Sequence, residues 1–352
     1  MHSMAVGRNG ELRPDGPRFR FKGFSLSLLL LVCALGISGA NAQLMKPSVT
    51  YYHVMFVSLD VGWLYGSGRI LATTDGGRSW ALWRASNSPG AAGHTPMEMQ
   101  LLSGQHGWVL YSESQLHRTV DGGHTWQVID VRPRGPDADP PYRADLNLLR
   151  MLTPQVGFGM NHSGDILLRM MDGGLTWRTS RFRQEQADFD ELYFLDTKRG
   201  WVGGNGEIYA TSDGGQVWHA LPKASVDGPY RMQFLSSARG WLLDYPSGRL
   251  FRTDTGGQNW QQCGSGQSTP KIYGFFFRTP TEGWAAAAGG NVLLTLDGCG
   301  TWSEVQASAT SVALQDVHFL DERNGWAVGS GDTVLKTTDG GLTWTPVQVN
   351  VP

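Results

Sequence analysis

The motif Thr-Xaa-Asp-Gly-Gly-Xaa-Thr-Trp, here called the box, comes back seven times with small departures. Successive box tryptophans are 46, 51, 41, 42, 42 and 42 residues apart, and a Gly-Trp or Gly-Phe pair, here called the marker, precedes each box. A β-type repeat of this length is typical of a propeller blade, a small sheet that buries both faces only between neighbours. The boxes end at Trp80, Trp126, Trp177, Trp218, Trp260, Trp302 and Trp344, and the markers begin at Gly62, Gly107, Gly157, Gly200, Gly240, Gly283 and Gly325.

The last repeat shows how one blade is built. Apolar and polar residues alternate over 314–319, and turn residues separate this strand from strands predicted at 325–328, 333–337 and 343–349, which we name a to d. The box aspartate is expected to accept hydrogen bonds within its turn, and the box tryptophan to fill the wide outer part of its blade. The sequence therefore predicts an all-β fold, a seven-bladed β-propeller of four-stranded blades, with the segment 46–50 adding an edge strand to the last blade.

The first 42 residues have the pattern of a secretory signal peptide. Three basic residues between positions 18 and 22 precede an apolar stretch at 24–37, which is shorter than the roughly 20 residues that cross a bilayer. We expect cleavage near Ala42 and Gln43, export to the periplasm or the cell exterior, and one propeller domain over 43–352. The mature chain then carries 24 basic and 29 acidic residues, and this net charge of −5 argues against a general nucleic-acid binder.

Two cysteines, Cys263 and Cys299, remain after this cleavage. In an oxidising compartment they either pair or stay as two buried thiols, and the sequence leaves both alternatives open. Their separation matches no metal-ligand pattern, so no metal site is predicted, and no cofactor site either. We expect a monomer.

The connections from strand d to the next strand a, after blades 1, 2 and 3, carry the length variation of the chain. Such insertions lie on one face of a propeller and are the usual place for a binding surface. They are rich in arginine with an aromatic neighbour, a common composition of protein-binding hot spots. The alternative is a solvated loop whose charges are balanced by nearby aspartates. The candidate partner-binding residues are Arg132, Arg134, Tyr142, Arg143, Arg181 and Arg183.

Box and marker together resemble the BNR or Asp-box repeat, in segments such as "GWAVGSGDTVLKTTDGGLTW" and "GWVGGNGEIYATSDGGQVW". Over about residues 46–350 the chain resembles the photosystem II assembly and stability factor family. That resemblance implies an exported, non-enzymatic propeller that binds an unassembled membrane-protein subunit through an arginine-rich surface. Fold does not fix function, however, and relatives also occur outside photosynthetic organisms.

Two other functions remain open. Sialidases and xyloglucan-cleaving hydrolases also carry Asp boxes, but the chain lacks their arginine signatures, and a glycosidase needs two carboxylates roughly 5 to 10 Å apart. The carboxylates at predicted b–c turns are turn residues as readily as catalytic ones, so no catalytic residue is predicted; they are Asp165, Glu207, Asp244 and Asp332. A purely structural or carbohydrate-binding exported propeller is the third interpretation, with the rings of Tyr65, Tyr111 and Tyr245 near b–c turns as sugar platforms.

Overall fold

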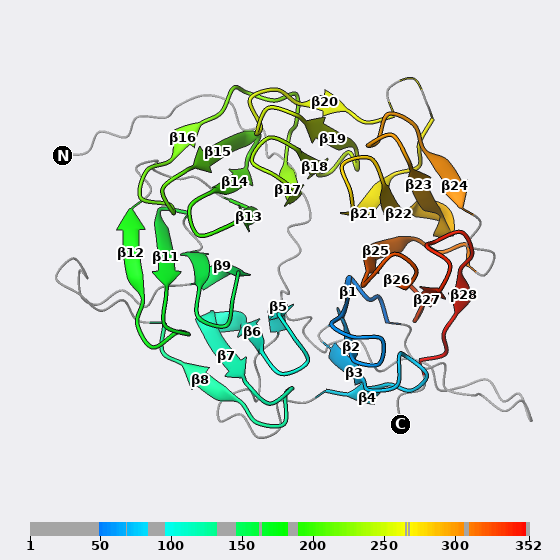
Figure 1. Cartoon of the computed structure of the whole chain (residues 1–352), viewed down its shortest axis with the longest axis horizontal. Helices are drawn as coiled ribbons and strands as arrows, with labels where there is room; N and C mark the ends of the chain where they lie inside the picture. Colours follow the sequence, from blue (N-terminus) through cyan, green and yellow to red (C-terminus); the bar gives the residue numbers. More distant parts are fainter. Residues whose placement is uncertain are drawn as a thin grey trace, which may run out of the picture. The chain divides into compact units, whose positions relative to one another are not determined.

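The computed structural model describes residues 49–67, 69–83, 96–131, 146–161, 164–181, 189–264, 266, 268–305 and 310–349, all within one compact unit, Ser38–Pro352. They form seven four-stranded antiparallel sheets, each made of four consecutive strands, arranged in a ring (Figure 1). The predicted seven-bladed propeller is therefore confirmed.

The strands and two short 3-10 helices follow in chain order. Blade 1 contains β1 (His53–Phe56), β2 (Gly62–Gly66), β3 (Arg69–Thr73) and β4 (Ala81–Leu82), and blade 2 contains β5 (Pro96–Leu101), β6 (Gly107–Tyr111), η1 (Ser112–Ser114), β7 (Gln115–Thr119) and β8 (Gln127–Ile129). Blade 3 contains β9 (Leu146–Met151), β10 (Gly157–Asn161), β11 (Ile166–Met170) and β12 (Arg178–Arg181), blade 4 contains β13 (Glu191–Phe194), β14 (Gly200–Gly204), β15 (Glu207–Thr211) and β16 (His219–Ala220), and blade 5 contains β17 (Pro229–Phe234), β18 (Gly240–Asp244), β19 (Leu250–Thr253) and β20 (Gln261–Gln262). Blade 6 contains β21 (Ile272–Phe277), β22 (Gly283–Ala287), η2 (Ala288–Gly290), β23 (Val292–Thr295) and β24 (Ser303–Val305), and blade 7 contains β25 (Leu314–Phe319), β26 (Gly325–Gly329), β27 (Val334–Thr337) and β28 (Thr345–Pro346).

The hydrogen bonds of the turns define two faces of the ring. In every blade the amide of the first box glycine donates to a carbonyl of the a–b turn, as Gly340 N does to Arg323 O at 2.9 Å. The b–c turns instead contact the d–a connections, as Tyr245 N does to Gly228 O at 2.7 Å. We call the first side the box face and the second the insertion face, and this division agrees with the prediction.

The box turns have the hydrogen bonds that the sequence predicts. In blade 7, Asp339 Oδ1 accepts from the amides of Leu342 and Thr343 at 3.0 Å, and Oδ2 accepts from Thr343 Oγ1 at 2.6 Å. The hydroxyl of Thr337 donates to Asp339 Oδ1 at 2.8 Å and accepts from Gly341 N at 2.9 Å. The bonds from Thr343, first its hydroxyl and then its amide, lower the pKa of Asp339 to about 2. The box is thus a folding device, because its aspartate is fully engaged by its own turn.

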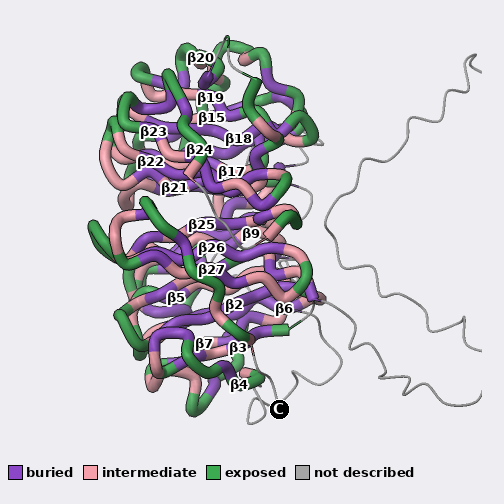
Figure 2. The backbone as a smooth tube through the Cα atoms, turned by 90° about the vertical axis from the view of Figure 1, so that its right-hand side faces the viewer, coloured by how far each residue is buried: buried purple, intermediate pink, exposed green. Residues whose placement is uncertain are grey.

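Seven hydrophobic cores fill the seven seams, and each combines residues of two neighbouring blades. Buried residues accordingly follow the strands, while exposed residues gather at the turns (Figure 2). The box tryptophan lies in the seam between its own blade and the preceding one. Trp177, for example, packs with Trp108 and Leu116 of blade 2. The expectation that this ring fills the outer part of its own blade is incomplete, because its core also contains residues of the neighbouring sheet.

A stacked aromatic pair marks five of the seams. In the seam between blades 4 and 5, marker Trp201 stacks on Phe234, the last residue of β17, with ring centroids 3.6 Å apart and planes inclined by 6°. Box Trp260 meets the other side of Phe234 edge-on at 6.1 Å. The same stacking joins Phe158 to Phe194, Trp241 to Phe277, Trp284 to Phe319 and Trp326 to Phe56. The sequence analysis missed this phenylalanine, which is replaced by Leu101 in blade 2 and Met151 in blade 3.

This aromatic packing explains why the marker begins with glycine. A Cβ atom on Gly240 would lie 2.4 Å from Cδ1 of Phe234, closer than any normal contact, and Gly283 and Phe277 repeat the arrangement at 2.4 Å. The ring therefore occupies the space of the missing side chain.

The ring closes between blades 7 and 1 with the contacts that join consecutive blades. Tyr51 N donates to Gly329 O at 3.1 Å, as Ile272 N does to Gly248 O at 3.1 Å between blades 5 and 6. Residues 49–51 thus contact the b–c turn of blade 7, whose sheet contains four strands, β25 to β28. For the described part of the segment 46–50, the predicted extra edge strand is wrong, because each blade already draws all four strands from one repeat.

Candidate functional site

Enlarged connections on the insertion face follow blades 1 and 2. They comprise 13 residues between β4 and β5, at 83–95, and 16 residues between β8 and β9, at 130–145, against eight or nine elsewhere. The prediction of a third insertion after blade 3 is wrong, because β12 takes up residues 178–181 and leaves nine residues, 182–190, before β13.

The predicted arginine patch lies almost wholly outside the described residues. Arg132, Arg134, Tyr142 and Arg143 belong to the second insertion, and Arg183 follows β12. Arg181 is the last residue of β12 and pairs with Ile166; only its backbone is described. The patch therefore stays a prediction.

The four candidate carboxylates at b–c turns are all engaged in hydrogen bonds. Asp165 accepts from Asn161 Nδ2 at 2.7 Å, Glu207 from Tyr209 OH at 2.9 Å, and Asp332 from Tyr51 OH at 3.4 Å. The fourth, Asp244, is buried and accepts from the amides of residues 227 and 228 at 2.8 and 2.9 Å. The first two bonds stay within one hairpin, and those of Asp332 and Asp244 hold b–c turns to other segments, so all four are structural and give no support to a catalytic pair.

Two of the three tyrosines proposed as sugar platforms are buried. Tyr65 is 5% exposed and donates its hydroxyl to Pro96 O and Met97 O, and Tyr111 is 6% exposed. Neither ring is available for stacking, because each packs in the seam between blades 1 and 2. The proposal is therefore wrong for these two, whereas Tyr245 remains partly exposed.

Charged side chains gather on the innermost strands, and no sequence motif marked them. They occupy the same position in their blades. At this position, a residue of strand a pairs with the third residue after the marker glycine. We call the seven residues at this position the axial ring. Its members are His53, Glu98, Leu148, Glu191, Arg231, Gly274 and Asp316.

An ion pair crosses the inner side of blade 6. Arg231 Nη1 of blade 5 lies 2.6 Å from Asp316 Oδ1 of blade 7, and Asp316 is only 4% exposed. Gly274 of blade 6 leaves room for this bridge, because a Cβ there would lie 3.1 Å from Asp316 Oδ1. Burial on its own would raise the pKa of Asp316, but the charge of Arg231, with the nearby His53, outweighs it and holds the pKa at about 2.

The axial acids also complete the free edge of the inner strands. Strand a has no partner strand on its inner side, and its amides there need acceptors. Glu98 Oε2 of blade 2 accepts from Leu149 N of blade 3 at 3.0 Å, and Asp316 Oδ2 accepts from Val54 N of blade 1 at 3.3 Å. Each acid thus links its blade to the next one.

The third acid, Glu191, accepts from Met232 N and has a raised pKa. Burial first, and then the negative charge of Glu98, raise its pKa from 4.5 to about 8, against the opposing charges of Arg150 and Arg231. Ionisation of both Glu98 and Glu191 is unfavourable, because it places two negative charges near each other.

This raised pKa predicts a pH-dependent stability. Between pH 4.5 and about 8 the folded state keeps a proton on Glu191 that the unfolded state releases, so the free energy of unfolding should fall as pH rises, by up to about 1.4 kcal/mol per pH unit. Glu191→Gln, which keeps an acceptor for Met232 N, should flatten this dependence. Urea unfolding at pH 5, 6.5 and 8 measures it, with Glu304→Gln on exposed β24 as the control. Parallel pH profiles of wild type and Glu191→Gln would contradict the assignment.

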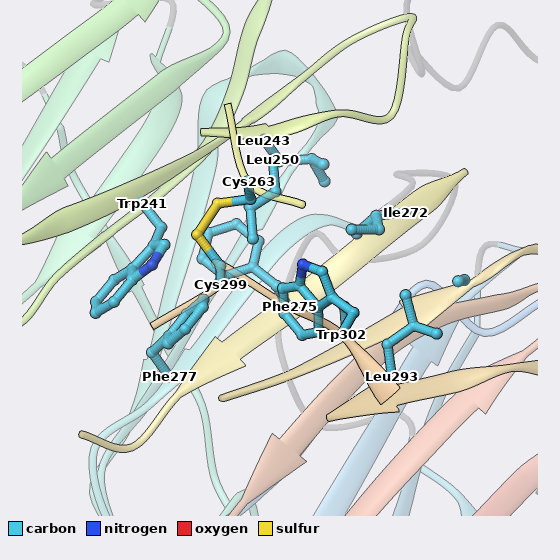
Figure 3. Close-up of a cluster of buried hydrophobic side chains, with 12 residues drawn as sticks. Trp241, Leu243, Leu250, Cys263, Ile272, Phe275, Phe277, Leu293, Cys299 and Trp302 are labelled. Carbon is cyan, nitrogen blue, oxygen red and sulfur yellow. A yellow bond between two sulfur atoms is a disulfide. The ribbon is translucent and has the colours of Figure 1, made fainter. Parts of the chain in front are cut away.

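Three further findings concern groups of metal-binding residues, membrane-spanning helices and the cysteine pair. No group of three His, Cys, Asp or Glu residues able to hold a metal ion occurs among the described residues. Over the same residues, no helix has the length and apolarity needed to cross a membrane. Cys263, after β20, and Cys299, in the blade 6 box, form a disulfide that ties blades 5 and 6 together beside Trp302 (Figure 3). This settles the alternative that the sequence left open.

Comparison with known proteins adds a family resemblance to this geometry. The sequence profile described as "Photosynthesis system II assembly factor YCF48" matches residues 40–142 and 299–352, which span blades 1 and 2 and the end of blade 6 with blade 7. No curated protein sequence matches the chain.

Solved structures show the same fold. "YCF48 bound to D1 peptide" matches with a TM-score of 0.65 at 20% identity, over 83% of this chain and 94% of that one. YCF48 from Cyanidioschyzon merolae matches with a TM-score of 0.65 at 19% identity, over 83% and 97%. Virginiamycin B lyase from Staphylococcus aureus matches with a TM-score of 0.62 at 12% identity, over 82% and 94%.

Fold and motifs together define the class of the protein as a seven-bladed propeller of box repeats. Within that class the chain resembles the photosystem II assembly factors, most directly over blades 1, 2 and 7. Across blades 3 to 5 and strands β21 to β23 of blade 6 the likeness rests on the fold.

Proposed function

We propose that the chain is an exported, non-enzymatic propeller that binds a protein partner through its insertion face. The observation that carries this proposal is the combination of a YCF48-like sequence and fold with enlarged connections confined to that face. One of the similar propellers is described as bound to a D1 peptide, which supports a peptide or an exposed segment of a protein as the ligand.

The partner in this proposal is an exported or membrane-embedded subunit awaiting assembly. The sequence of the second insertion contains Arg132, Arg134, Tyr142 and Arg143, on a chain whose net charge after cleavage is −5. Arginine pairs with carboxylates through two parallel hydrogen bonds, and a neighbouring aromatic ring adds contact area. An acidic surface or tail on the partner is the chemistry that such a patch recognises.

Capture from detergent-solubilised membranes tests this proposal. The triple variant Arg132→Glu, Arg134→Glu and Arg143→Glu should lose a partner that wild type retains, because charge reversal turns attraction into repulsion. A matched control reverses three exposed charges on the box face, at Arg78, Lys198 and Arg323, and should keep that partner. Capture should also weaken as salt rises.

A separate pair of substitutions distinguishes the insertion from the ordinary connection after blade 3. Arg181→Glu with Arg183→Glu should weaken capture less than the triple variant, since these residues lie outside the enlarged segments. Partner profiles that are identical for wild type and the triple variant would remove the insertion from the mechanism. Turnover of a glycoside by the pure protein would overturn the non-enzymatic function.

A further inference from the structure

Five inner strands carry a β-bulge at one position, where strand a contributes a residue that has no partner on strand b. The bulged residues are Met97, Asn147, Tyr230, Tyr273 and Gln315. A bulge bends the strand and redirects one side chain out of the normal alternation. In the adjacent blades 5 and 6 the redirected residue is tyrosine, Tyr230 in β17 and Tyr273 in β21.

Two further residues join these tyrosines at the insertion-face end of the seam between blades 5 and 6. Tyr245, in the b–c turn of blade 5, lies with its ring centroid 5.9 Å from that of Tyr230, at an angle of 50°. The ammonium of Lys271, just before β21, lies 5.6 Å from the Tyr245 ring and 5.5 Å from the Tyr273 ring. We call these four residues the tyrosine–lysine cluster.

Part of the cluster is open to solvent. Tyr230 keeps 37% of its surface exposed and Lys271 is exposed, while Tyr245 and Tyr273 are half-buried. The rings of Tyr230 and Tyr245 are inclined by 50° to each other, so they do not form one flat platform. The exposed part of the Tyr230 ring offers contact area to an apolar or aromatic side chain of a partner.

The backbone under the cluster is fixed from both sides. Lys271 O accepts from Ala288 N at 2.9 Å, and Ile272 N donates to Gly248 O at 3.1 Å across the seam. The disulfide between Cys263 and Cys299 fastens the same two blades. A surface that is already ordered loses little entropy when a partner binds, which favours affinity.

The cluster carries an exposed cation. Lys271 makes no ion pair with any described residue. Two more exposed cations, Lys223 and Arg249, lie on the same face of blade 5, and Asp227 is an exposed acid between them in the sequence. An unpaired ammonium next to tyrosine rings complements a carboxylate that follows or precedes an apolar side chain.

We propose that the tyrosine–lysine cluster is a second docking site for the partner, which binds an acidic protein segment. A glutamate or aspartate of that segment pairs with Lys271, and a neighbouring phenylalanine or leucine packs on the exposed ring of Tyr230. This inference rests on the proposed function, and it extends the binding surface from the insertions of blades 1 and 2 to the seam of blades 5 and 6.

A fluorescence-anisotropy titration of the full mature chain tests the site. The probe is a labelled 12-residue peptide of alternating Glu and Asp around one Phe; a second peptide has Lys and Arg in place of the acids, and an oligogalacturonate serves as the sugar arm. We expect only the acidic peptide to bind. Lys271→Glu should weaken it roughly tenfold or more, Tyr230→Ala should weaken it severalfold, and Lys198→Glu on the box face should leave it unchanged.

Three results would overturn the site: no binding of the acidic peptide up to millimolar concentration, equal affinity in wild type and Lys271→Glu, or binding of the oligogalacturonate in its place. Lys271→Glu alters an exposed side chain, so loss of binding with an unchanged thermal midpoint reports on docking and not on folding. Every insertion arginine stays in place in Lys271→Glu, so equal affinity of wild type and this variant would remove the cluster and leave the result of the membrane capture intact.

Discussion

Phe234→Ala is expected to lower the free energy of unfolding by about 3 to 5 kcal/mol, a typical cost for removing a phenylalanine from a tightly packed core. Phe234 is 1% exposed and lies between the marker and box tryptophans of neighbouring blades, Trp201 and Trp260. The missing Cβ of Gly240 leaves the remaining space to the same ring. Truncation therefore opens a cavity that rigid indole groups cannot refill by small movements.

Chemical denaturation followed by far-ultraviolet circular dichroism measures this loss. Tyr230→Ala is a matched control, because it removes another aromatic ring from the same strand at a position that is 37% exposed, and it should cost less than about 1 kcal/mol. Equal losses for the two variants would show that the stacked pair does not hold the seam.

The local parts of this fold were predictable from the sequence. The box is a turn whose aspartate, threonines and glycines bond within eight residues, so its geometry follows from its own composition, as the bonds of Asp339 and Thr337 confirm. Blade number followed from the repeat. Strand d was predicted too long in blade 7, at 343–349 against Thr345–Pro346, because the outermost strand has little to pair with.

The contacts between blades were much harder to predict. The pair of Arg231 and Asp316 joins positions 85 residues apart, in blades that are not neighbours. The axial ring follows no motif, since the same position holds histidine, glutamate, leucine, arginine, glycine or aspartate in different blades. Aligning the repeats on the marker would have exposed this variable charged position, and it would also have revealed the recurring phenylalanine six residues before the marker in five blades.

Exposure was the second source of error. Tyr65 lies near a b–c turn, which suggested an exposed ring, but its hydroxyl reaches the carbonyls of residues 96 and 97 and its ring closes a seam. Tyr230 gave no comparable signal, because a bulge and not the alternation of the strand decides where it points. Bulges depend on pairing with a neighbouring strand, and that pairing cannot be predicted from the local sequence alone.

Breaking the disulfide should have the second large effect. Cys263→Ala is expected to lower the free energy of unfolding by about 3 to 4 kcal/mol, since the bond closes a loop of 36 residues and restricts the unfolded chain. A reductant should bring wild type down to the stability of Cys263→Ala and leave that variant unchanged. Thermal midpoints with and without dithiothreitol measure both effects, and a wild-type midpoint that ignores the reductant would contradict the prediction.

Cys299→Gly distinguishes the effect of losing the disulfide from the effect of the backbone strain at position 299. Cys299 stands where the other boxes have their second glycine, and its φ of 83° lies in the left-handed region that favours glycine. The substitution removes the same disulfide but relieves this backbone, so Cys299→Gly should be more stable than Cys263→Ala by about 1 kcal/mol. If both variants lose the same stability, the backbone strain at position 299 is negligible. If Cys299→Gly is the less stable variant, packing of the Cys299 side chain in the core around Trp302 stabilises the fold by more than the backbone strain costs.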